Sequence, residues 1–230
     1  MRAPWLNTPW LNMPLPAVLW QRMAAIVVLS LGTMMASMPA QAVTPPDEVI
    51  RSAVERMTQR IDAERDKLAG DPAYARKVVN EELDELVDFR RITRLVMGDH
   101  FAAASRDQRN RFMERFRRSM VQTYAAGVTM YEGQPINVLP LAEEDVRGDR
   151  ARVQMEFATE SGRPMPIAYT MFKDDEVWKV DNVIVNGLNL GRVFRMQFDQ
   201  AVRQHGGDID KVIAGWSTEV DIEEAAAGGG

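Results

Sequence analysis

The feature that most constrains the fold is a change in hydrophobic period at about residue 134. Before it, apolar residues recur every three or four positions, which is the spacing of amphipathic helices. After it, apolar and polar residues alternate, as in strands with one buried face. The segments between these strands are short and turn-like, so neighbouring strands are expected to run antiparallel. We therefore predict an α+β protein with a curved four-stranded antiparallel sheet and helices packed on one face.

Local signals place the helices before the sheet. Asp71 is a predicted N-cap because Pro72 follows it at the first helical position. Ser105 and Gln108 form a predicted capping box, which opens the longest apolar stripe of the chain. The predicted helices before the sheet cover residues 46–70, 71–87, 92–98 and 105–133.

The alternating segments that follow are the predicted strands. They cover residues 136–138, 151–157, 167–171 and 177–185. Helical spacing then returns, with Val193, Phe198 and Val202 on one stripe that stops at Gly206. A last helix is predicted to begin near Asp208 or Asp210.

The first 42 residues differ from the rest in carrying only two charged side chains, Arg2 and Arg22. An apolar run over 23–35 and the small-residue ending at Ala42 predict a signal peptide, residues 1–42, cleaved after Ala42. An uncleaved membrane anchor is the alternative, because residues 23–42 are just long enough to cross a bilayer. The mature chain is then predicted to be one α+β domain over 43–220, followed by a disordered tail over 221–230.

The net charge and the absence of cysteine exclude several kinds of partner and modification. Without Arg2 and Arg22, 26 basic and 33 acidic residues leave a net charge of −7, which disfavours a nucleic-acid partner. The chain has no cysteine, so it can hold neither a disulfide nor a lipid-modified N-terminal cysteine. One helix face does carry Arg111, Arg115 and Arg118. It is either a solvated surface or a docking site for an acidic partner or lipid headgroups.

Residues that catalyse reactions are scarce. His100 and His205 are the only histidines, and neither has a partner at metal-ligand spacing. We therefore predict no enzyme activity, no metal and no cofactor. One alternative is Asp181 in the last strand, which could serve as a general base in a cone-shaped α+β pocket. Its structural interpretation is a carboxylate that caps a neighbouring backbone group or pairs with an arginine.

Two spaced blocks carry a resemblance to a known family. The first is ITRLVMGDHFAAASRDQR at 92–109, and the second is WKVDNVIVNGL at 178–188. Over roughly residues 45–216, the chain resembles the MlaC-type periplasmic phospholipid-binding proteins, also called the toluene-tolerance auxiliary family. It departs from the family pattern at Phe101, where Trp is usual, at Asn186, where Glu is common, and at Asn189, where Ser is common.

The resemblance implies a soluble periplasmic carrier without chemical turnover. Its cargo would be a phospholipid, which it would shuttle between an inner-membrane ABC-type lipid transporter complex and an outer-membrane lipoprotein complex. This transport would maintain the lipid asymmetry of the outer membrane. The alternative is a periplasmic adaptor or chaperone whose apolar groove binds protein segments instead of lipid.

A carrier of this kind needs an apolar pocket, which we expect between the inner sheet face and the longest helix. Val183, Val185 and Leu188 are expected at its mouth. The other candidate lining residues are Phe116, Met120, Tyr124, Val128, Val153, Met155, Phe157, Ile167, Tyr169 and Met171. For each of them, the alternative is a place in a solid core.

Overall fold

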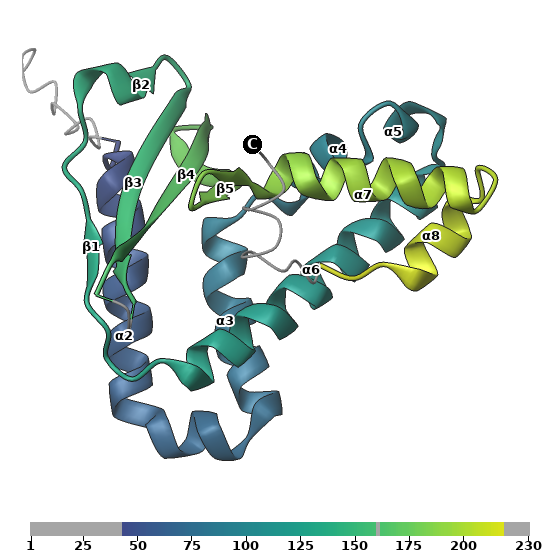
Figure 1. Ribbon diagram of the computed structural model, residues 1–230. Coiled ribbons are helices and arrows are strands. Elements are labelled where there is room, and N and C mark those ends of the chain that lie inside the picture. Colours follow the sequence, from purple (N-terminus) through teal and green to yellow (C-terminus); the bar gives the residue numbers. More distant parts are fainter. Residues whose placement is uncertain (1–42, 160–161, 219–230) are drawn as a thin grey trace, which may run out of the picture. The chain divides into compact units, whose positions relative to one another are not determined.

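The helices form where the apolar stripes and caps predict them (Figure 1). The computed structural model describes residues 43–159 and 162–218; the predicted signal peptide and the predicted tail lie outside the described residues. The helices are α2 (Pro46–Gly70), α3 (Pro72–Leu86), α4 (Phe89–Met97), α5 (His100–Ala103), α6 (Arg106–Met130), α7 (Leu190–Gln204) and α8 (Ile209–Gly215). The four-residue α5 was not predicted, because it is too short to show a period. Within the described residues, no helix combines the length and the apolarity that crossing a bilayer requires.

Both predicted N-terminal caps are confirmed. The Asp71 carboxylate accepts hydrogen bonds from the backbone N–H groups of Ala73 and Tyr74 at 2.9 and 3.0 Å. The Ser105 hydroxyl accepts from the Gln108 N–H at 3.1 Å, and the Gln108 side chain accepts in return from the Ser105 N–H at 2.9 Å. These bonds satisfy N–H groups that the first helical turn leaves without partners, so they fix where α3 and α6 begin.

The sheet has six strands among the described residues, not the predicted four. They are β1 (Ile136–Val138), β2 (Val146–Arg147), β3 (Arg150–Ala158), β4 (Pro164–Asp174), β5 (Val177–Val185) and β6 (Leu188–Asn189). Every pair is antiparallel, in the order β1-β3-β4-β5-β6, with β2 paired to the start of β3. The prediction missed β2 and β6 because two residues are too few to show alternation.

A β-bulge in β5 determines which way its polar side chains point. Thr170 of β4 pairs with Asn182, whereas Met171 pairs with Val180, so Asp181 is the extra residue. A bulge of this kind turns the extra residue and its successor to the same side. Asp181 and Asn182 therefore share the sheet face of Thr170, and Tyr169 lies on the opposite face.

The bulge anchors the helical part of the protein to the sheet. The Asp181 side chain is only 2% exposed and accepts hydrogen bonds from Arg91 at 2.7 Å, Arg150 at 2.6 Å and Thr170 at 3.0 Å. Arg91 belongs to α4 and also stacks 3.8 Å from the ring centre of Phe172. Helix α4 therefore contacts the sheet face opposite Tyr169, so the prediction that helices pack on one face is incomplete.

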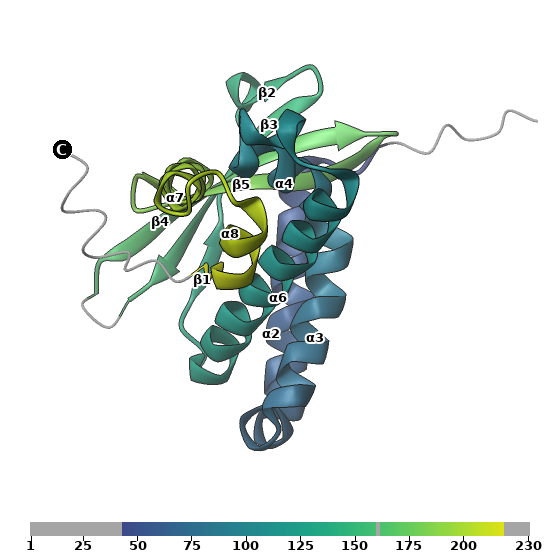
Figure 2. The same cartoon turned by 90° about the vertical axis from the view of Figure 1, so that its right-hand side faces the viewer.

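The apolar interior consists of two separate cores. The helix core joins α3, α4, α6, α7 and α8 with the second half of α2. The sheet core contains buried residues of β1, β3, β4 and β5, covered by Ile50 from the first half of α2. Helices α2, α3 and α6 run side by side (Figure 2). The closest packing neighbours of α6 are helices rather than strands.

We predict that Asp181→Asn lowers the free energy of unfolding by about 3 kcal/mol, because the change leaves two arginines beside a neutral group. The partial exposure of both arginines, 28% for Arg91 and 46% for Arg150, keeps the loss at the low end of the range for buried pairs. Urea unfolding measures it. The control is Asp174→Asn, an exposed carboxylate on the neighbouring strand, which should change stability by less than about 0.5 kcal/mol. Equal effects of the two changes would contradict the role of Asp181.

Candidate functional site

The register brings all nine predicted strand candidates onto one face of the sheet. Val153 pairs with Tyr169, Met155 pairs with Ile167, and Tyr169 also pairs with Val183. Paired residues lie on the same face. By the same register, this face also carries Phe157, Met171, Val185 and Leu188.

Burial divides these side chains into two groups. Val153, Met155 and Met171 are at most 5% exposed and belong to the sheet core under α2. Val185 is also buried. Phe157, Ile167, Tyr169, Val183 and Leu188 are only half-buried. The apolar face is therefore unevenly covered, because buried Val153 and Met155 on β3 pair directly with half-buried Tyr169 and Ile167 on β4.

The four candidates on α6 also differ in their surroundings. Phe116 is 2% exposed and packs edge-on against Phe194, with ring centres 5.4 Å apart, inside the helix core. Val128 is buried in the same core. Met120 is half-buried against it, and Tyr124 is 46% exposed. Of the predicted stripe, only Met120 and Tyr124 therefore present apolar surface outside the core.

Two tyrosines connect the helix side to the sheet side. Tyr124 on α6 and Tyr169 on β4 lie close enough for the charge of one hydroxyl to act on the other. Burial raises the pKa of Tyr169 well above its usual value, and the charge of the neighbouring Tyr124 raises it further. The Tyr169 hydroxyl also lies 4.0 Å from the Met155 sulfur. Both hydroxyls are therefore neutral at physiological pH.

We call the apolar side chains that lie between the two cores the inter-core surface. On the helix side Met120 packs against the helix core, and on the sheet side Ile167, Tyr169 and Val183 pack against the sheet core. The inter-core surface comprises Met120, Tyr124, Ile167, Tyr169 and Val183. Its chemistry is apolar, with two neutral hydroxyls as the hydrogen-bonding groups. Such a surface can hold an apolar ligand and orient one or two polar atoms of it.

Two residues of this region, Met165 and Ile50, are absent from the candidate lining residues predicted from the sequence. Met165 pairs with Phe157 and so lies on the same sheet face, which the two-residue period counted back from Ile167 could have shown. Ile50 lies in the first predicted helix, and it covers the sheet core rather than the helix core. The stripe shows that Ile50 faces inward, although it cannot show which layer it meets.

The residues considered for catalysis lie elsewhere. Both carboxylate oxygens of Asp181 accept hydrogen bonds, on the sheet face opposite Tyr169. The ring of His100 contacts the Asp199 carboxylate at 2.9 Å on the helical side. Among residues 43–159 and 162–218, no three acidic or histidine side chains are grouped as metal ligands. Asp181 therefore pairs with arginines, which the sequence analysis gave as the alternative to a role as general base.

Comparison with known proteins shows which family the sequence resembles. A family model described as MlaC protein matches residues 51–218. The toluene tolerance protein Ttg2D of Pseudomonas putida is 33% identical over 208 residues, which cover 89% of this chain and 96% of that protein. The MlaC binding protein of the intermembrane phospholipid transport system of Haemophilus influenzae is 27% identical over 113 residues, which cover 49% of this chain and 53% of that protein.

A solved structure shares the fold. The phospholipid-binding protein of Ralstonia solanacearum, solved in complex with a phospholipid, has a TM-score of 0.64 with this chain at 22% identity. The match covers 73% of this chain and 96% of that one.

The division between core and inter-core surface predicts different costs of truncation on α6. Phe116→Ala should lower the free energy of unfolding by about 3 to 5 kcal/mol, because it leaves a cavity among packed aromatic rings. Tyr124→Ala, two turns further along, should cost only about 1 kcal/mol, because nearly half of that side chain is already exposed. Urea unfolding of both variants tests this, and a larger loss for Tyr124→Ala would place it in the solid core.

The tyrosine pair predicts a late step in the alkaline titration of the folded protein. Tyr169 should ionise well above pH 10, and Tyr169→Phe should remove this late step from the ultraviolet absorbance of tyrosinate. Because its pKa is raised by folding, Tyr169 stabilises the fold below about pH 10, and this contribution is lost as the pH rises further. A late step of unchanged size in Tyr169→Phe would show that another tyrosine causes it.

Proposed function

Because the chain belongs to the MlaC family, we propose that it is a periplasmic carrier that holds one phospholipid and shuttles it between the two membranes of the cell envelope. It would exchange its cargo with an inner-membrane ABC-type lipid transporter complex and an outer-membrane lipoprotein complex. This exchange would maintain the lipid asymmetry of the outer membrane. Residues 1–42 would direct export and be removed after Ala42.

The observation that carries the proposal is the inter-core surface. Apolar side chains normally complete a packed core, because each buried one contributes free energy to folding. Here Ile167, Tyr169 and Val183 remain half-buried, and Tyr124 is 46% exposed opposite them. We place the acyl chains of the lipid between this part of the sheet and α6, with Phe157 and Leu188 further along the same sheet face.

The remaining candidate residues would border this pocket. Val153, Met155, Met171 and Val185 lie beside it on the same sheet face, and Phe116 and Val128 lie in the helix core on the same helix as Tyr124. The acyl chains would therefore rest on two packed layers that stay folded when the lipid leaves. Such a preformed surface lowers the cost of each binding event.

Energetics explain why a lipid needs a carrier of this type. Two acyl chains of about sixteen carbons expose apolar surface worth on the order of 25 kcal/mol in water, at about 0.8 kcal/mol per methylene. Unaided transfer across the aqueous space is therefore negligible. A carrier must bury a comparable surface, but it must not bind so tightly that a membrane complex cannot reclaim the lipid. A mainly apolar surface with few polar anchors meets both conditions.

The tyrosine pair would serve as that small set of polar anchors. Both hydroxyls are neutral, so they can donate to an ester oxygen of a lipid without placing a charge beside its acyl chains. No bond of the cargo needs to break for this role. The arginine-bound carboxylate of Asp181 supports this absence of turnover, because it is held away from the pocket.

We predict that residues 43–230, purified without detergent and extracted with organic solvent, release about one phospholipid per chain by mass spectrometry. Ile167→Glu should lower this ratio at least about tenfold, because a carboxylate in the pocket would have to be desolvated against acyl chains. The matched control is Gln154→Glu, which adds the same charge on the exposed face of β3.

The outcomes separate the proposal from its alternative. A lipid ratio that falls in Ile167→Glu and not in Gln154→Glu, with unchanged circular dichroism, supports the pocket. Equal ratios in both variants would remove Ile167 from it. Folded protein that repeatedly releases no lipid would overturn the carrier, and a bound peptide in the extract would favour the adaptor.

A further inference from the structure

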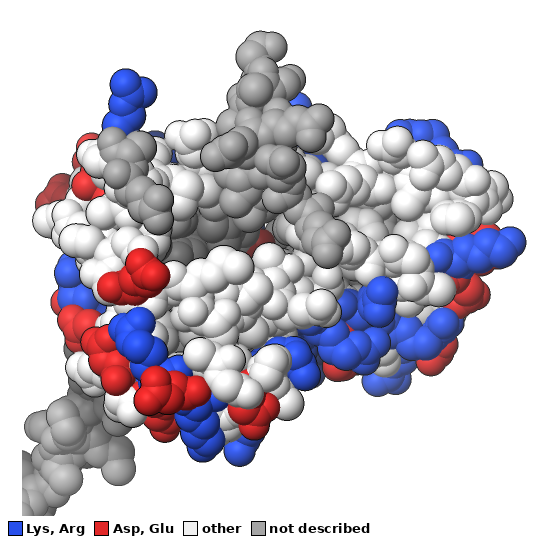
Figure 3. All heavy atoms as spheres, turned by 60° about the horizontal axis from the view of Figure 1, so that its bottom comes forward, with Lys and Arg blue, Asp and Glu red and all other residues white. Residues whose placement is uncertain are grey.

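Helix α6 carries positive charge on a chain that is acidic overall. It contains six arginines and two acidic residues, whereas the whole chain has a formal net charge of −5. Lys and Arg side chains gather on the part of the surface in Figure 3 that corresponds to α6 and α8 in Figure 1. A local field of this sign attracts acidic ligands to one place on the protein.

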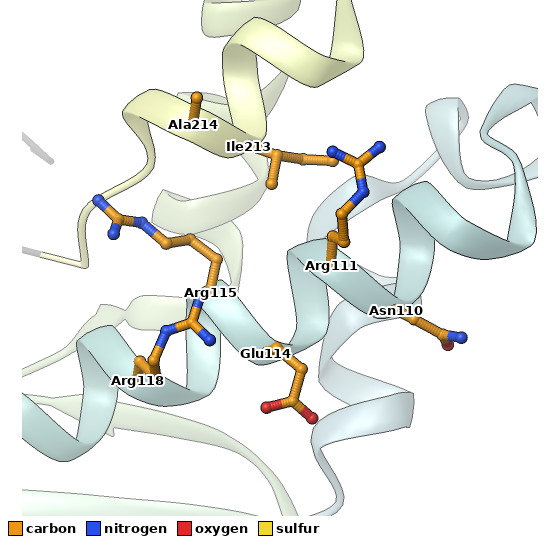
Figure 4. Close-up of a pocket in the computed structure, with 7 residues that line it drawn as sticks. All are labelled: Asn110, Arg111, Glu114, Arg115, Arg118, Ile213 and Ala214. Atoms are coloured by element: carbon orange, nitrogen blue, oxygen red, sulfur yellow. The ribbon is translucent and has the colours of Figure 1, made fainter.

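Three of these arginines line a groove between α6 and α8. Arg111, Arg115 and Arg118 recur at steps of four and three residues, so they share one face of α6. Ile213 and Ala214 of α8 form the opposite wall, and the groove encloses about 430 Å³. Figure 4 shows Arg111 and Arg115 reaching from α6 toward α8, whereas Glu114 points the other way.

The first arginine of this row already binds carboxylates. Arg111 pairs with Asp107 at 2.6 Å and with Asp210, which α8 presents from across the groove. The hydrogen bonds that Asp210 accepts from Arg111 and from Gln108 lower its pKa, so Asp210 is ionised at neutral pH. The groove therefore holds a carboxylate at one end, supplied by the chain itself.

The next two arginines, Arg115 and Arg118, still have N–H groups that can donate hydrogen bonds to a ligand. Arg115 donates through Nε to the Trp216 carbonyl oxygen at 3.0 Å, which leaves its outer N–H groups available. Arg118 is exposed, and within the described part of the chain it has neither an ion pair nor a hydrogen bond. Along the helix axis they are separated by about 4.5 Å at 1.5 Å per residue.

We propose that this groove is a docking site for an acidic segment of a partner protein, with two carboxylates bound by Arg115 and Arg118. Neighbouring carboxylates on one helix face, or on alternate residues of a strand, have a matching spacing of about 5 to 7 Å. Ile213 and Ala214 provide an apolar wall for a small side chain between them. The inference does not depend on whether the protein carries lipid.

The shape and composition of the groove favour a polypeptide over a bilayer surface. Surface binding to lipid requires exposed apolar side chains that insert into the membrane. The large exposed apolar side chains among the described residues are Leu95, Tyr124, Met130, Val177 and Met196, and none of them lines the groove. A concave site with arginine on one wall suits a protruding carboxylate-bearing segment instead.

The test uses the mature chain and a fluorescent helical peptide with glutamate at every fourth position. Its counterpart carries glutamine at the same positions. The glutamate peptide should bind in fluorescence anisotropy, and Arg115→Glu/Arg118→Glu should weaken that binding at least about tenfold. Arg76→Glu/Arg152→Glu changes the net charge equally at two exposed sites outside the groove, so it should weaken binding less than about twofold at about 0.15 M salt.

Four results would overturn the proposal. The first is equal affinity for the glutamate and glutamine peptides, and the second is equal weakening in both double variants. The third is binding of phosphatidylglycerol vesicles that depends on Arg115 and Arg118 without peptide binding, which would assign the groove to headgroups. The fourth is peptide binding only after truncation behind Thr218, because the occupant would then be the chain's own acidic residues 219–224.

Discussion

The contact between Asp181 and two arginines is the constraint on which the rest of the structure depends. The sheet and the helices have separate cores, which packing joins only through α2 and through Val87. The bulge in β5 adds a polar connection, because Asp181 holds Arg91 at the start of α4. Its neighbour Asn182 accepts the Gly191 N–H at 2.8 Å, at the start of α7. A Cβ atom on Gly191 would lie 2.5 Å from that amide oxygen, so only glycine allows α7 to begin so close.

This polar connection explains why the protein can leave apolar surface uncovered. If one core held the two layers together, it would need to fill the space between them. Anchoring at one edge of the sheet lets α6 stay apart from β4 except where Tyr124 meets Tyr169. Unbranched side chains such as Met120 and Met155 suit the borders of such a space, since they adapt to ligands of irregular shape. The stability of the fold and the availability of the surface therefore rest on different residues.

How much of the fold and of the candidate site can be predicted from the sequence depends on whether the contacts involved are local or distant in sequence. Caps and periods are local, so the bounds of α3, α6 and the long strands could be predicted from residues such as Asp71 and Ser105. Phe116 and Tyr124 occupy the same stripe, yet one lies in an aromatic cluster and the other outside the core. A helical period shows only which face turns inward, and the layer that each turn meets depends on contacts distant in sequence. For the same reason, the arginine partners of Asp181, which lie 90 and 31 positions away, could not be named in advance.

The two halves of α6 place the proposed docking and lipid-binding surfaces on one rigid element. Its first half carries Arg111, Arg115 and Arg118, and its second half carries Met120 and Tyr124. Nine residues separate Arg115 from Tyr124, which is about 14 Å along a helix. Helix α6 packs against α2, α3, α4 and α8, so a force on its first half moves the second half with it. A partner held in the arginine groove would therefore stand within one lipid length of the tyrosine pair, beside the proposed lipid-binding surface.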